Sequence, residues 1–191
     1  MLTIDPKNIT KFDRSQEELE FFWLFCILVA GKNADWASLK LLDLFRNKPE
    51  DQTPFEFLKT HLTDLNNILV ANKVGQYRRV QMAITQSLEV DLRTASVAEL
   101  MEIHGVGPKT ARFFILHTRA NAECAVLDTH ILKWMRGLVD PIFEVPASTP
   151  PINKYQTLEF VAIKLMKTHF PNISLAEADL LIWTNMSGRL D

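Results

Sequence analysis

The segment from Ile103 to Ile115, IHGVGPKTARFFI, places two glycines, a proline and a lysine ahead of an apolar helical stretch. Gly105 and Gly107 have no Cβ, so they allow positive φ and let the backbone approach another surface closely. Pro108 suits the first turn of a helix, where its missing N–H costs nothing. Free N–H groups at such a turn bind anions, including DNA phosphates. The segment predicts a helix-hairpin-helix turn, although an ordinary glycine-capped connection between helices would share this short pattern.

The sequence around the turn predicts an all-α fold. Ser-x-x-Glu capping boxes begin at Ser15, Ser96 and Ser174, and each precedes an apolar run with helical periodicity. A loop is expected at residues 141–151, which hold four of the nine prolines. About ten helices and no strand are expected on these signals. The helices before and after the glycine turn must hold it in place.

The composition suits a soluble protein with a substantial core. Hydrophobic residues make up 47% of the 191 positions, and the formal net charge is -2. Because the chain is not basic as a whole, any DNA binding must depend on a local patch. Residues 1–14 do not resemble a signal peptide, and the apolar run 21–30 is too short to cross a bilayer. We expect an intracellular location, in the cytoplasm or nucleoid, and no membrane partner.

The sequence gives no indication of a metal cofactor held by side chains. Its two cysteines, Cys26 and Cys124, cannot hold an iron–sulfur cluster that needs four. Its five histidines are scattered without the spacing of metal ligands. The two cysteines are expected to pack as small apolar residues in a reducing compartment.

Three segments together resemble the helix-hairpin-helix DNA glycosylase superfamily, which includes endonuclease III and the 8-oxoguanine DNA glycosylases. The first is HGVGPKTA at residues 104–111, and the second is AVLDTH at 125–130. Lys109 and Asp128 are 19 positions apart (128 − 109 = 19), which fits the family. The third is VGQYRRVQMA at 74–83, ahead of the hairpin. His104 stands where the family usually has proline.

The resemblance implies roles for the residues in these segments. Lys109 would be the nucleophile that attacks the sugar and forms a Schiff base, and Asp128 would stabilise positive charge on the sugar. Lysine is protonated in water, so its site must lower its pKa, and Arg112 on the same helix could contribute. A lysine that only contacts phosphate is the alternative. The implied DNA contacts are listed together: Gly105, Val106, Gly107, Arg78, Arg79 and His130.

The last segment, ADLLIWTNMSGRLD at 178–191, is similar to the end of the compact archaeal-type 8-oxoguanine glycosylases. Asp179 and Trp183 are four positions apart and share a helix face. The resemblance implies that they line the base pocket together with Trp36, since an extruded base needs an aromatic face and polar partners. The alternative is that Trp183 belongs to the core. Those enzymes tend to end in lysine, and this sequence ends in Asp191.

The resemblance also implies an architecture of two helical lobes with a cleft between them. Residues 21–121 would form a six-helix barrel that ends in the hairpin at about 96–119. Residues 1–20 and 122–191 would form the second lobe, with the aspartate and the base pocket. A monovalent cation could bind the backbone carbonyls of the hairpin, which are those of Met101, Ile103 and Val106.

The function implied is that of a bifunctional DNA glycosylase and abasic-site lyase in base excision repair, acting as a monomer on double-stranded DNA with a damaged base. The base expected is 8-oxoguanine. Alkylated purines, oxidised pyrimidines and modified bases of viral DNA are alternatives within the same superfamily. A different class is a DNA-binding module that keeps the hairpin without catalysis. Schiff-base trapping would separate the two classes, since only an enzyme with an amine nucleophile becomes cross-linked.

Overall fold

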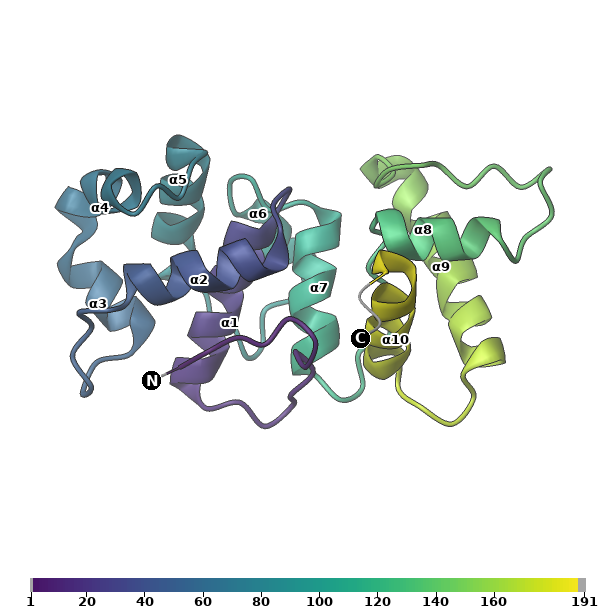
Figure 1. The fold of residues 1–191 in the computed structure, drawn as a ribbon, viewed down its shortest axis with the longest axis horizontal. Coiled ribbons are helices and arrows are strands. Elements are labelled where there is room, and N and C mark those ends of the chain that lie inside the picture. The colour runs from purple at the N-terminus through teal and green to yellow at the C-terminus, as the bar shows by residue number, and fades with distance from the viewer. Residues whose placement is uncertain (1, 189–191) are drawn as a thin grey trace. The chain divides into compact units, whose positions relative to one another are not determined.

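The computed structural model describes residues 2–188, and the C-terminal Asp191 lies outside them. This part of the chain contains ten α-helices, one short 3-10 helix and no strand (Figure 1), so the all-α prediction is confirmed. The elements in chain order are α1 (Gln16–Val29), α2 (Ala34–Leu44), α3 (Pro54–Thr60), η1 (Leu62–Asp64), α4 (Leu65–Ala71), α5 (Tyr77–Ser87), α6 (Val97–Glu102), α7 (Pro108–Thr118), α8 (Thr129–Arg136), α9 (Ile152–His169) and α10 (Leu175–Ser187).

The predicted capping boxes begin three of these helices. Ser15, Ser96 and Ser174 each accept a hydrogen bond from the backbone N–H of a glutamate three residues on, and that glutamate bonds back to the serine N–H. A fourth box, at Thr53 and Glu56, begins α3. These reciprocal bonds satisfy N–H groups that a helix start leaves open, so local sequence fixes where the helices begin.

The described chain divides into two compact units. One comprises the residues up to Pro6 together with Asp13–Phe114, and the other comprises Lys7–Phe12 and the residues from Ile115 onwards. The division falls inside α7, so this helix contributes its first turns to one unit and its last turn to the other. The domain boundaries inferred from the family resemblance stay a prediction.

The first unit is organised around α1, which packs against α2, α3 and α5. Every residue of α1 from Leu19 to Leu28 is buried. The Phe22 ring lies beside those of Phe113 and Phe114, with centroids 5.8 and 6.1 Å apart. The Trp23 indole donates a 2.7 Å hydrogen bond to the hydroxyl of Ser87. Through these contacts α1 anchors the middle of α7, the second helix of the hairpin, and the end of α5.

The second unit contains α8, α9 and α10, and α8 packs mainly against α10. Tyr155 and Met166 of α9 and Ile182 of α10 are fully or nearly fully buried in it. The short N-terminal segment Lys7–Phe12 belongs to this unit too. Its Lys11 N–H donates to the carbonyl of His117, at the end of α7.

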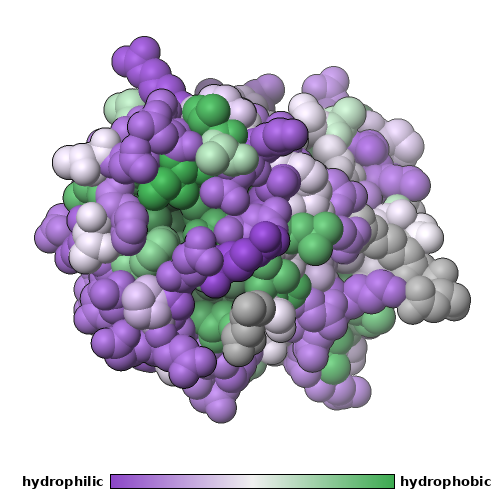
Figure 2. Space-filling view, turned by 60° about the vertical axis from the view of Figure 1, so that its left-hand side comes forward, coloured by the Kyte–Doolittle hydropathy of each residue, from purple (hydrophilic) through white to green (hydrophobic). Residues whose placement is uncertain are grey.

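Most large apolar side chains of the described residues are buried, although a few, such as Ile142 and Phe160, are exposed. On the face that Figure 2 shows, hydrophilic residues cover most of the area and hydrophobic residues form small patches between them. None of the helices in residues 2–188 combines the length and the hydrophobicity that crossing a membrane would need.

Candidate functional site

The hairpin turn is closed by a hydrogen bond from the Val106 N–H to the Ile103 carbonyl, at 3.0 Å. Gly105, the third residue of the turn, has φ +76°, whereas His104 is not among the residues with positive φ. This combination is typical of a type II turn, whose third position favours glycine. The prediction that a glycine here supplies positive φ is confirmed for Gly105. Gly107 has no such φ, and a Cβ built on it would meet nothing within 4 Å.

Helix α5 supports this turn from the inside of the first unit. A Cβ on Gly105 would lie 2.5 Å from Cγ of Arg79, so the turn rests directly on that side chain. Arg79 is half-buried and donates through Nη2 to the carbonyl of Ile27, at 3.0 Å. Two turns further along α5, the Gln86 side chain accepts a 2.6 Å hydrogen bond from the His104 N–H. Arg79 therefore holds the turn, while its neighbour Arg78 is exposed.

Several backbone N–H groups of the turn stay open. The first regular bond of α7 runs from the Ala111 N–H to the Gly107 carbonyl, at 3.1 Å, which puts Gly107 at the N-cap position. Within the described chain, the N–H groups of Gly105, Gly107 and Lys109 have no hydrogen-bond acceptor. They lie at the positive end of the α7 dipole. The turn therefore offers an anion site made of backbone groups.

Lys109 occupies the first turn of α7 and is half-buried. One turn on, the Arg112 guanidinium is only 7% exposed, and its Nη1 donates to the Pro108 carbonyl at 3.3 Å. A buried cation therefore lies at the same end of the helix as the lysine amine.

The carbonyls proposed to hold a monovalent cation lie at the end of α6 and in the turn. The Ile103 carbonyl already accepts the Val106 N–H, while those of Met101 and Val106 accept no bond across the turn. Carbonyl oxygens at a helix end carry partial negative charge and suit a hard cation. The donor set fits such an ion, and the cation stays a proposal.

In the second unit, the segment before Asp128 is fixed by α9. The Tyr155 hydroxyl accepts from the Leu127 N–H (2.9 Å) and donates to the Ala125 carbonyl (3.1 Å). Glu159 accepts the Ala125 N–H at 3.0 Å. These buried bonds hold an extended chain that has no sheet to pair with. They position Asp128 directly before α8.

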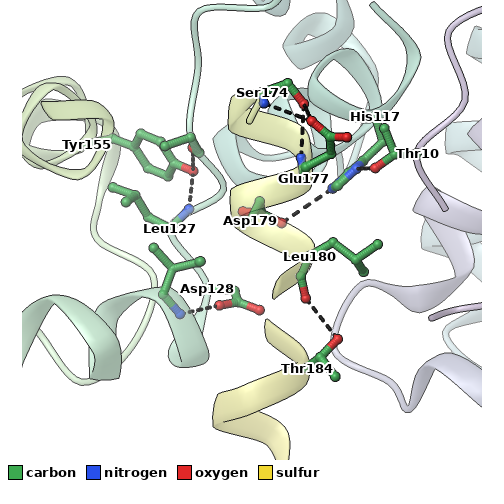
Figure 3. A network of polar contacts seen from close by, with 12 residues as sticks. Thr10, His117, Leu127, Asp128, Tyr155, Ser174, Glu177, Asp179, Leu180 and Thr184 are labelled. Carbon is green, nitrogen blue, oxygen red and sulfur yellow. Dashed lines mark hydrogen bonds and ion pairs between the residues drawn. The ribbon is translucent and has the colours of Figure 1, made fainter. Parts of the chain in front are cut away.

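Asp128 is the N-cap of α8. Its Oδ1 accepts the N–H groups of His130 and Ile131, each at 2.8 Å, which leaves Oδ2 without a hydrogen bond from the described residues. Figure 3 shows one of these bonds at Asp128. Capping fixes the side-chain rotamer and keeps the carboxylate next to the helix dipole, where negative charge is favoured. One oxygen is committed to the helix, and the other can face a ligand.

Asp179 of α10 is arranged in a similar way. It is 5% exposed, and its Oδ2 lies 3.3 Å from Nε2 of the fully buried His117. Its Oδ1 is buried and has no hydrogen-bond partner in the described chain. Burial raises the pKa of Asp179, as does the negative charge of Asp128, whereas the hydrogen bond from His117 opposes that rise. Asp128 and Asp179 are here called the carboxylate pair, and each has one oxygen without a hydrogen bond from the described residues.

Two aromatic rings lie beside the carboxylate pair. His130, two residues after Asp128, has its ring edge-on to Trp183, with centroids 6.0 Å apart. Trp183 is one turn after Asp179 on α10 and is half-buried. The second unit therefore brings together four of the predicted site residues. Trp36 lies on α2 of the first unit, where the Lys32 ammonium is 5.4 Å from its ring centroid.

His117 and Thr10 were not among the predicted site residues. The Thr10 hydroxyl lies 2.8 Å from Nδ1 of His117, whose other nitrogen meets Asp179 (Figure 3). The three residues are 107 and 62 positions apart in sequence. A histidine in the apolar run FFILH offers a weak signal, since an imidazole on a buried helix face requires polar partners. Nothing local to Thr10 indicates its part in the contact.

Comparisons with known proteins support the hairpin motif and the fold. The helix-hairpin-helix motif family matches residues 89–113, which contain α6, the turn and the start of α7. The fold is similar to that of the Methanocaldococcus jannaschii 8-oxoguanine glycosylase/lyase, whose crystal structure holds a 15mer DNA containing 8-oxoguanine. The TM-score is 0.67 at 23% identity, over 92% of this chain and 84% of the other. The predicted glycosylase-type helical fold with a helix-hairpin-helix motif is confirmed.

Proposed function

We propose that this protein is a DNA glycosylase and abasic-site lyase of the helix-hairpin-helix superfamily, which removes a damaged base from double-stranded DNA. The base proposed is 8-oxoguanine. The proposal rests on the fold, on the hairpin with open N–H groups, and on a lysine and an aspartate in the positions the superfamily uses. It also assigns the chain to base excision repair.

In this proposal the hairpin binds the DNA backbone. The open N–H groups of Gly105, Gly107 and Lys109 would donate to a phosphate, and the helix dipole would add a favourable charge. The open space beside Gly107 supports a close approach by the sugar–phosphate chain. Such contacts carry no base specificity. They bind any duplex, with an affinity that falls as salt concentration rises.

Lys109 is proposed as the nucleophile. Its neutral amine attacks C1′ of the damaged nucleotide while the bond from C1′ to the base nitrogen breaks, and the base leaves with that electron pair and takes up a proton. The sugar ring then opens to a Schiff base between Nζ and C1′. Loss of a proton from C2′ breaks the bond from C3′ to the phosphate oxygen. Water releases the product and regenerates the lysine.

The carboxylate pair is proposed to serve the two ends of the nucleotide. Asp128, with its open Oδ2, would stabilise positive charge on the sugar as the base departs. Asp179, whose buried Oδ1 has no partner in the described residues, would accept a hydrogen bond from an N–H of the extruded base, and the Trp183 ring would stack on that base. His130 would contact the backbone beside Asp128. An 8-oxoguanine base offers an N–H at position 7 that guanine lacks, which a carboxylate can select.

One observation favours an enzyme over a DNA-binding module that kept only the hairpin. The chain before Asp128 is held by a buried tyrosine and a buried glutamate, and it ends in a capping carboxylate with an open oxygen. A module that only binds phosphates could cap this helix with an uncharged residue, and a carboxylate would repel DNA. An enzyme that stabilises a cationic sugar requires one.

The test is a panel of duplexes that carry 8-oxoguanine, thymine glycol, uracil, an alkylated purine or a plain abasic site. Single-turnover reactions are followed by strand cleavage with and without added alkali, which separates base removal from lyase activity. The proposal expects fastest cleavage of the 8-oxoguanine and abasic duplexes, without alkali. Faster removal of another base would show that 8-oxoguanine is not the preferred substrate, while the proposed reaction would stand. Tight binding with no cleavage of any duplex would establish a binding module.

A further inference from the structure

We infer that His117 and Thr10 are positioning residues that hold Asp179 with one carboxylate oxygen turned toward the extruded base. The inference rests on the proposed function and extends it to residues outside the superfamily motifs quoted above. It concerns base recognition and leaves the lysine chemistry untouched.

The contacts form a chain from the N-terminal segment to α10 within the second unit. Thr10 contacts Nδ1 of His117 at 2.8 Å, and Nε2 of His117 contacts Oδ2 of Asp179 at 3.3 Å. An ionised carboxylate can only accept, so Nε2 carries the proton and donates. Nδ1 is then the acceptor for the Thr10 hydroxyl. The carboxylate therefore fixes the histidine tautomer, and the Thr10 hydroxyl stabilises it by donating to Nδ1.

The arrangement is unusual for a purely structural contact. Buried carboxylates in protein cores are paired or fully hydrogen-bonded, yet Oδ1 of Asp179 is buried with no partner in the described residues. The titratable groups acting on Asp179 are His117 from α7 and Asp128 at the N-cap of α8, and the negative charge of Asp128 repels it. Glu159 of α9 is engaged by the Ala125 N–H. A donor from a ligand would complete the shell of Asp179.

The N-terminal segment is attached to the same histidine twice. Besides the Thr10 side chain, the Lys11 N–H donates to the His117 carbonyl at 3.1 Å. Removing only the Thr10 hydroxyl would leave this backbone bond and the packing of the segment in place. Thr10 is half-buried, so a change of similar shape is tolerated better there than at His117, which is fully buried.

The experiment compares Thr10→Val, Thr10→Ser and the wild type. Valine keeps the shape without the hydroxyl, and serine restores it. The matched control is Thr168→Val, because Thr168 is exposed and bonds only the Lys164 carbonyl of its own helix. Each protein is assayed in single turnover on the abasic duplex and on the duplex with the base that the wild type removes fastest. The readout is the ratio of base removal to abasic-site cleavage.

We expect Thr10→Val to lower this ratio about fivefold, the size of one neutral hydrogen bond, and Thr10→Ser and Thr168→Val to keep it. The abasic duplex has no base to recognise, so loss confined to the base-containing duplex identifies a positioning role. If Thr10→Val lost the same rate on both duplexes, or kept the wild-type ratio, the positioning role would be wrong and the proposed function would still stand. A wild type that cleaves neither duplex would overturn the proposed function and the inference with it.

Discussion

The hairpin of the first unit and the carboxylate pair of the second leave different groups open to a ligand. The hairpin offers backbone N–H donors at an exposed turn, supported from behind by Arg79 and Gln86. The carboxylate pair offers single oxygens of two acidic side chains, each fixed by its other oxygen. Donors suit phosphate, which every nucleotide has, whereas acceptors suit a cationic sugar and the N–H groups of a base. The hairpin therefore suits binding to any DNA, whereas the carboxylate pair suits catalysis at the sugar and recognition of the damaged base.

The largest effect is expected at Asp128. Asn also caps helices, so Asp128→Asn should keep α8 and lose only the charge. We expect single-turnover base removal to fall by about two to three orders of magnitude, as when a group that stabilises transition-state charge is removed. Thermal unfolding should change little for Asn, while Asp128→Ala should cost about 1 kcal/mol of stability. Equal activity of Asp128→Asn and wild type would remove the aspartate from catalysis.

The two glycines of the hairpin should separate folding from binding. In Gly105→Ala a Cβ would meet Arg79 at a residue with φ +76°, so we expect the free energy of unfolding to fall by about 1–2 kcal/mol. Gly107→Ala meets open space, so it should lose less stability than Gly105→Ala, the loss coming from alanine at an N-cap position. Its methyl group would face the phosphate. We expect about tenfold weaker binding to any duplex, measured by fluorescence anisotropy. Unchanged binding by Gly107→Ala would show that the DNA backbone contacts a different surface.

Replacing Asp179 by asparagine should raise the stability of the fold and lower the rate of base removal. Its folded-state pKa is raised by burial, so ionising it at neutral pH costs folding free energy. Asp179 contributes fully to folding stability only below its pKa in the unfolded chain, and this contribution is lost as the pH rises through its pKa in the folded protein. Asp179→Asn should therefore raise Tm by a few degrees at pH 7, and the gain should vanish in acid.

Base removal by Asp179→Asn should fall about tenfold relative to abasic-site cleavage, because a charged acceptor becomes a neutral amide. The wild type should lose the same selectivity as pH falls and Asp179 takes up a proton. Parallel pH profiles for the wild type and Asp179→Asn would contradict this role.

The smallest effects are expected at the adjacent arginines of α5. Exposed Arg78 should contact DNA, so Arg78→Ala should weaken binding a few-fold and reduce the slope of log affinity against log salt by about one. Arg79 bonds Ile27 and supports Gly105, so Arg79→Ala should mainly lower Tm. Salt titrations and thermal melts of both variants measure the difference. If Arg79→Ala reduced the slope of log affinity against log salt by a full unit, Arg79 would be a DNA contact and not only a support for the turn.

Local signals in the sequence predict the hairpin and the helix starts well, because their causes are local. The capping boxes need residues three apart, and Gly105 needs only its own φ. Asp128 is predictable as an N-cap for the same reason. The tie between Thr10, His117 and Asp179 depends on tertiary packing across 107 and 62 positions, which no periodicity encodes. The support that Arg79 gives to Gly105 likewise depends on tertiary packing, because its guanidinium bonds the Ile27 carbonyl of α1.

The most direct test of the central claim is borohydride trapping on the 8-oxoguanine duplex, with the cross-linked residue identified by peptide mass spectrometry. Lys109→Gln serves as the variant, and Lys133→Gln, an exposed lysine of α8, serves as the control. The account predicts a covalent adduct at Lys109 for the wild type and Lys133→Gln, and none for Lys109→Gln. An adduct that persists in Lys109→Gln, or no adduct in the wild type while the duplex is bound, would contradict it.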